Sequence, residues 1–156
     1  MKTKDIEKGI YTTFAEIATA IGYSEIHGRV IGALLVSNKK LSLNELAKKT
    51  GYSLSTVSLS LDLLEFLGMI KKTKKAGDRK LYVELHGNLL EGLKKAFIMR
   101  IQKSIDGTLA KFDEYKDELE IIKDGEEKKN VMKALNILED EVNRVNKYVG
   151  LLHKLK

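Results

Sequence analysis

The sequence predicts a mainly α-helical protein that carries one small β-hairpin. Apolar residues recur at steps of three or four through most of the chain, which is the spacing of one face of an α-helix. Residues 81–85 instead alternate between apolar and polar side chains, which is the period of a half-buried β-strand. Towards the end of the chain the apolar residues follow a strict heptad repeat, so this last helix requires a partner helix.

Composition limits the class of protein. The 156 residues include no Cys, so disulfides and thiolate metal sites are excluded and a reducing compartment is expected. Residues 1–14 carry charges where a signal peptide would need an apolar stretch, and no apolar run approaches the ~20 residues of a membrane-spanning helix. We therefore expect a cytoplasmic protein of one compact domain, or a small domain with helical extensions, and no membrane partner.

Amphipathic helices are predicted at both ends of the chain. Residues 4–21 and 24–37 carry the first two apolar stripes, and a third stripe continues over about seven turns to residue 122. After a break at "KDGEEKK" the heptad seam begins. This seam, the stripe that ends at residue 122 and the first stripe together expose more apolar surface than a monomer leaves in water, so we expect a homodimer. The predicted interface residues are Ile10, Phe14, Ile17, Val131, Leu135, Leu138, Val142, Val145, Val149 and Leu152.

Two short helices joined by a tight bend are predicted in the middle of the chain. Ser42 is a suitable N-cap with Glu45 at the capping-box position, and this helix ends at Gly51. Ser53 is a suitable N-cap for the next helix, which continues to residue 67 and stops at Gly68. Val57, Leu61 and Leu64 form the apolar face of this second helix and are expected to pack on Leu43 and Leu46.

A basic β-hairpin follows. The segment "KKTKKAGDRKLY", residues 71–82, reads as two short strands around a glycine-containing turn. The ten basic and four acidic residues between Lys39 and Lys80 account for the whole net charge of +6. A solvated, Lys-rich surface is the alternative explanation of this charge.

Short helices joined by a tight bend and followed by a basic hairpin describe a winged helix-turn-helix, whose second helix enters the major groove of DNA. We therefore predict three parts: an N-terminal dimerisation helix (1–22), a winged helix-turn-helix DNA-binding domain (23–87) and a C-terminal helical dimerisation region (88–156). Short hydroxyl side chains let the helix N-terminus approach phosphates, and Arg79 at the hairpin tip is suited to a minor groove. The predicted DNA-binding residues are Ser53, Ser55, Thr56, Ser58, Leu59, Lys72, Lys74, Lys75, Arg79 and Lys80.

Each of these assignments has a plainer alternative. Ser53 can serve only as a helix cap while the other hydroxyls are solvated, above all that of Ser60. The hairpin can be an edge that lysines keep soluble. Asp78 at the tip would repel phosphate, so we expect it to accept hydrogen bonds in the turn or to orient Arg79.

The stretch "STVSLSLDLLEFLGMIKK…GDRKLYVEL" resembles the MarR superfamily of winged-helix regulators, and more closely its GbsR-like branch of archaeal type. The residues that match by position are Thr56, Val57, Ser58, Leu61, Gly68, Gly77, Asp78, Arg79 and Lys80. Asp62 and Leu63 replace basic residues common in such relatives, and Leu67 replaces a tryptophan. The resemblance implies a homodimer held by terminal helices and, in some relatives, control by a small-molecule effector such as choline or an aromatic compound.

Enzymatic motifs are absent from the sequence. His27, His86 and His153 lie far apart, without metal-ligand spacing, and neither a phosphate-binding glycine loop nor GxSxG occurs. We expect no enzyme and no cofactor, but a sequence-specific regulator of transcription, in the first place a repressor, that binds double-stranded DNA as a homodimer on an inverted-repeat operator. The alternative is a winged-helix protein-interaction or basal transcription module with non-specific DNA contact. Such a module would not need the whole excess of positive charge to lie in the segment that contains the hairpin.

Overall fold

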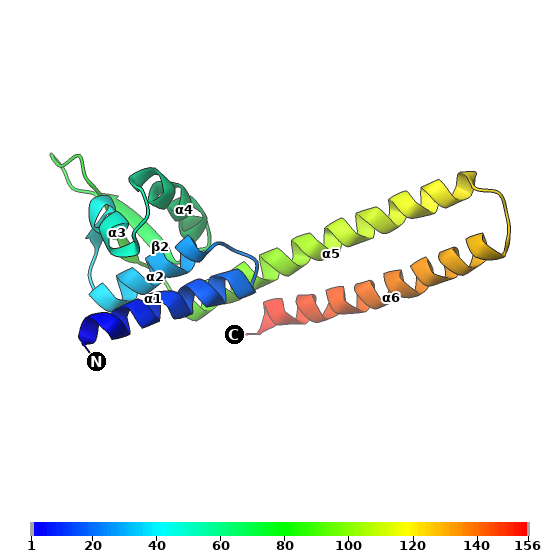
Figure 1. Cartoon of the computed structure of the whole chain (residues 1–156), viewed down its shortest axis with the longest axis horizontal. Coiled ribbons are helices and arrows are strands. Elements are labelled where there is room, and N and C mark those ends of the chain that lie inside the picture. Colours follow the sequence, from blue (N-terminus) through cyan, green and yellow to red (C-terminus); the bar gives the residue numbers. More distant parts are fainter. Residues whose placement is uncertain (1, 156) are drawn as a thin grey trace. The chain divides into compact units, whose positions relative to one another are not determined.

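The computed structural model describes residues 2–155 and confirms the predicted mainly α-helical winged-helix fold (Figure 1). In this range the elements are α1 (Thr3–Ala20), α2 (Glu25–Ser37), β1 (Leu41–Ser42), α3 (Leu43–Thr50), α4 (Leu54–Phe66), β2 (Ile70–Lys74), β3 (Leu81–Leu85), α5 (Leu89–Ile121) and α6 (Glu126–Lys154). The chain forms two compact units, which meet between Ala96 and Phe97 within α5. The predicted three-part division, with boundaries after residues 22 and 87, stays a prediction. Within residues 2–155, the helices are all too short or too polar to cross a membrane.

The first unit is built around one apolar core. Leu46 of α3 and Val57 and Leu61 of α4 are fully buried in it, as the sequence predicts, together with Val83 of β3 and Leu34 of α2. Helix α1 packs along α2. The close approach of these two helices requires Gly28, because a Cβ at this position would collide with the backbone carbonyl of Phe14.

The ends of α3 and α4 confirm the capping pattern. The Ser42 hydroxyl accepts a hydrogen bond from the Glu45 amide at 3.2 Å, and a Glu45 carboxylate oxygen accepts one from the Ser42 amide at 3.2 Å. Gly51 ends α3 with a φ of 79°, and Gly68 follows α4 with a φ of 75°, both in the left-handed region that favours glycine. Local chemistry therefore fixes the bend between the two helices.

The hairpin is confirmed, and the structure adds a third strand to it. The antiparallel sheet has the order β1-β3-β2, and the β2–β3 register runs from the pair Ile70 and Leu85 to the pair Lys74 and Leu81. Strand β1 pairs Leu41 with Val83. Strand β1 has only two residues, which is too short to show the alternating pattern of a strand, so the sequence does not predict it.

The second unit is an antiparallel hairpin of α6 and the part of α5 that begins at Phe97. Ile98 and Ile105 of α5 pack with Val149 of α6. Polar contacts join the same helices. The Gln102 side-chain amide, between Ile98 and Ile105 in sequence, donates to Asn146 Oδ1 at 3.1 Å, and further along Lys116 Nζ lies 2.8 Å from Glu139 Oε2.

The heptad seam of α6 splits into two rows in this hairpin. Leu135 and Val149 are buried within the chain, and Val142 and Leu152 are half-buried. The other row stays open, with Val131, Leu138 and Val145 exposed by 47%, 49% and 42%. Helix α5 is therefore the partner that covers the first row, and the apolar surface of the second row stays exposed.

Candidate nucleic-acid interface

Helix α4 presents a short line of side chains on the face opposite its buried stripe. Ser55, Leu59, Asp62 and Phe66 follow one another at steps of four, three and four, and all of them are exposed. Leu59 is 74% exposed, although it is a large apolar residue. This face therefore combines a hydroxyl, two apolar groups and one carboxylate, and it carries no basic side chain.

The hydroxyl groups at the start of α4 have different roles. The Ser53 hydroxyl accepts a hydrogen bond from the Thr56 amide at 3.2 Å and lies 2.7 Å from the Thr56 hydroxyl, so Ser53 caps the helix. Ser55 and Thr56 are exposed and Ser58 is half-buried. Ser60 is buried and donates to the Val57 carbonyl at 2.6 Å, so it is neither solvated nor available to a ligand.

The hairpin tip is organised around Asp78. One carboxylate oxygen accepts from the Lys80 amide at 2.9 Å, and the other accepts from the Tyr82 hydroxyl at 3.1 Å. These hydrogen bonds, first that of the Lys80 amide, hold the pKa of Asp78 below its usual range. Of the two roles expected for Asp78, these contacts are those of an acceptor in the turn. The tip extends from the sheet (Figure 1), and Lys74, Lys75, Arg79 and Lys80 are exposed along it.

Lys72 differs from the other hairpin lysines. Its ammonium lies 2.6 Å from Asp62 Oδ1 and 3.8 Å from Glu65 Oε1, both on α4. The hydrogen bond with Asp62 is the main reason why the pKa of Lys72 is raised. A phosphate contact of Lys72, which the sequence predicts, would have to compete with these two carboxylates.

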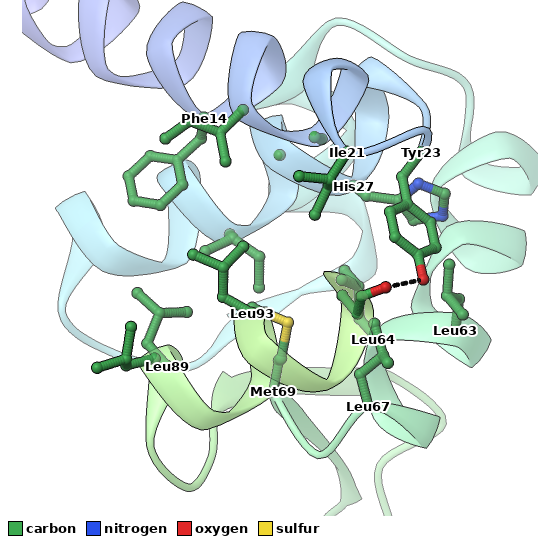
Figure 2. Close-up of a pocket in the computed structure, with 16 residues that line it drawn as sticks. Phe14, Ile21, Tyr23, His27, Leu63, Leu64, Leu67, Met69, Leu89 and Leu93 are labelled. Atoms are coloured by element: carbon green, nitrogen blue, oxygen red, sulfur yellow. Dashed lines mark hydrogen bonds between the residues drawn. The ribbon is translucent and has the colours of Figure 1, made fainter. Parts of the chain in front are cut away.

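An apolar cavity of about 340 Å³ lies in the first unit, beside the C-terminal end of α4 (Figure 2). Phe14 of α1, Leu64 of α4 and Leu93 of α5 are among the side chains that line it. Its two polar side chains are already engaged: the Tyr23 hydroxyl donates to the Ala96 carbonyl at 2.7 Å, and His27 Nδ1 accepts from the Ser24 amide at 3.3 Å. Burial lowers the pKa of His27.

The sequence does not predict this cavity. Its walls come from α1, α2, α4 and the start of α5, so it depends on contacts between distant segments. Phe14 and Ile17, which we predict at a dimer interface, both line it. Their place in such an interface stays a prediction.

Comparison with known proteins gives a likeness of fold. No protein-family model and no curated protein matches the chain. Among solved structures, a transcriptional regulator matches with a TM-score of 0.56 and 19% identity, over 96% of this chain and 99% of that one. This likeness shows a shared fold.

Two weaker matches have names that state a bound ligand or a family. One is a mutant of S. aureus MepR bound to an oligodeoxyribonucleotide, with a TM-score of 0.44 and 21% identity over 91% of this chain and 94% of that one. The other is ZitR of Lactococcus lactis, a zinc-responsive MarR family member, with a TM-score of 0.38 and 16% identity over 76% of this chain and 75% of that one.

Proposed function

We propose that this protein is a transcriptional regulator of the MarR type, of a GbsR-like kind, that binds double-stranded DNA sequence-specifically. The observation that carries the proposal is the position of the exposed face of α4 beside a hairpin whose basic side chains point into solvent. In a winged helix-turn-helix, α4 is the recognition helix in the major groove, and the β2–β3 hairpin is the wing on the backbone or in the minor groove.

The charge distribution supports this placement. The segment between Lys39 and Lys80 carries the whole net charge of +6, and it contains both α4 and the wing. Lys74, Lys75 and Lys80 are exposed and suited to phosphate contacts, which release counterions and supply most of the affinity. Arg79 at the tip is suited to the negative potential of a narrow minor groove.

A homodimer is part of the same proposal. Val131, Leu138 and Val145 leave an apolar row exposed on α6, and a second copy of the chain would cover it. A two-fold dimer presents two recognition helices in opposite directions, so its operator is an inverted repeat. Binding at an operator that overlaps a promoter would make the protein a repressor.

The cavity supports control by an effector. Its volume of about 340 Å³ lies in the range of small-molecule sites, and its lining is almost entirely apolar. Because Leu64 and Leu67 at the end of α4 line it, an occupant would contact the recognition helix directly. We therefore propose that an uncharged, apolar compound binds there and changes the affinity for DNA.

Selection of bound duplexes from a random pool tests the proposed function. The expected result is enrichment of an inverted repeat whose half-site centres lie about one helical turn, roughly 10 bp, or a multiple of it apart. DNA binding without enrichment of any sequence would instead indicate a protein-interaction or basal transcription module with non-specific contact. Absence of DNA binding would contradict both.

A further inference from the structure

On the basis of the function proposed above, we propose that Leu59 sets the base preference of α4 by contacting the C5-methyl group of thymine. Leu59 stands on the outermost line of the helix and is 74% exposed. A leucine cannot donate or accept a hydrogen bond. The thymine methyl is the apolar group that base edges offer in the major groove, so it is the group that this side chain can recognise.

The neighbouring side chains on the same line are already engaged. Asp62 lies one turn further along α4, where the Lys72 ammonium is 2.6 Å from its carboxylate. The Phe66 ring lies 4.8 Å from the Lys95 ammonium, which also donates to the Phe66 carbonyl at 3.2 Å. Of the two apolar side chains on this line, Leu59 is therefore the one that remains to make contacts, and it is also the more exposed, at 74% against 62% for Phe66.

Charge selects DNA as the occupant of this face. Leu59 lies about one and two-thirds turns, roughly 9 Å along the axis, from the cap at Ser53, where the helix N-terminus favours a phosphate. Further along α4, Lys72 joins the wing to the helix at Asp62, and the wing exposes Lys74, Lys75 and Arg79. An apolar side chain that lies along α4 between a helix N-terminus and the junction with a basic wing fits the floor of a major groove better than the apolar surface of another protein.

Replacement of thymine by deoxyuridine removes only the methyl group and leaves the hydrogen-bonding edge intact. The duplex is the one with the highest affinity for the wild-type protein after selection from the random pool. Each thymine is replaced in turn, symmetrically in both half-sites, and the affinity is measured for the wild type and for Leu59→Ala. Leu35→Ala, an exposed Leu on α2, is the matched protein control.

We expect deoxyuridine at one or two positions per half-site to weaken wild-type binding about tenfold, which corresponds to one methyl contact in each half-site. Leu59→Ala should bind the thymine duplex about as weakly and lose its sensitivity to deoxyuridine, while Leu35→Ala behaves as the wild type. Circular dichroism should show equal helix content in all three proteins.

Two results would overturn the inference while the proposed function stands. In one, the wild type binds every deoxyuridine duplex as well as the thymine duplex; in the other, Leu59→Ala keeps the full sensitivity. Failure of the wild-type protein to bind any duplex would overturn the proposed function and this inference together.

Discussion

The Lys72 ammonium lies 2.6 Å from the Asp62 carboxylate, and this ion pair joins strand β2 of the wing to the outer face of α4. Glu65 approaches the same ammonium to 3.8 Å. Asp62 is a carboxylate on a surface that we propose to face DNA, where an unpaired negative charge would repel phosphates. The pair therefore neutralises this charge and withdraws one lysine from the exposed basic set.

Release of this ion pair should strengthen DNA binding. Asp62→Asn removes one negative charge from α4 and leaves Lys72 with only the more distant carboxylate of Glu65. A phosphate can then compete for Lys72, so the slope of log K against log salt concentration should become steeper by up to about 0.9. The slope is measured by fluorescence anisotropy at several salt concentrations. Glu16→Gln on α1 removes an exposed carboxylate elsewhere and is the control. Equal slopes for all three proteins would show that Asp62 does not face DNA.

The exposed wing residues should contribute to affinity in two different ways. Lys74→Ala and Lys75→Ala should each weaken binding to all sequences alike and reduce the salt slope by about 0.9, because each removes one phosphate contact. Arg79→Ala should in addition reduce the preference for A·T-rich flanks. Binding and salt slope that match the wild type in all three variants would show that the hairpin is only a soluble edge.

Two exposed residues of α6 should hold the dimer. The double variant Leu138→Asp with Val145→Asp places two charges in the apolar row and should give a monomer in sedimentation velocity at tens of micromolar, with loss of operator binding. Asn143→Asp adds a charge at another exposed position of α6 and should leave the dimer intact. A wild-type chain that sediments as a monomer would end this part of the proposal.

The cavity should bind apolar compounds more tightly at neutral pH than in acid. Burial already lowers the pKa of His27, and an apolar occupant would bury the ring further, so binding is linked to the neutral imidazole. Affinity should be constant at pH values above the lowered pKa of His27 in the free protein, and it should fall as the pH decreases below that pKa, because the occupied cavity lowers it further. Fluorescence titration with N-phenyl-1-naphthylamine measures this dependence.

His27→Gln provides the control for this pH dependence, because it keeps a polar side chain but does not titrate. Its affinity for the same probe should not change between pH 8 and pH 5. An equal loss of affinity in acid for the wild type and this variant would show that His27 is not the group that titrates.

Local features of the sequence predict most of the fold. The N-cap at Ser42 depends on Glu45, and the stop at Gly51 depends on a hydrogen bond to Ala47. Each end of α3 is therefore set by residues close together in the sequence. The heptad seam shows that α6 needs a helical partner. It cannot show that α5 covers Leu135 and Val149 while Leu138 stays open, because the identity of the partner is not written in the spacing.

The candidate site is predicted less completely, for a similar reason. Exposure of Leu59 and Arg79 follows from the helix period and the hairpin turn. The contact of Lys72 with Asp62 depends instead on how β2 packs against α4, and ten residues of sequence separation give no sign of it. The cavity has no sequence signal at all, because it is the space that several helices leave between them.

The central claim is that α4 and the wing together recognise a DNA sequence. The most direct measurement is the affinity of the wild-type protein for its selected inverted repeat and for a scrambled duplex of equal composition at the same salt concentration. We predict a preference of at least about 10³-fold for the repeat. The logarithm of the binding constant should fall linearly as the logarithm of the salt concentration rises. Equal affinity for the two duplexes would contradict the claim.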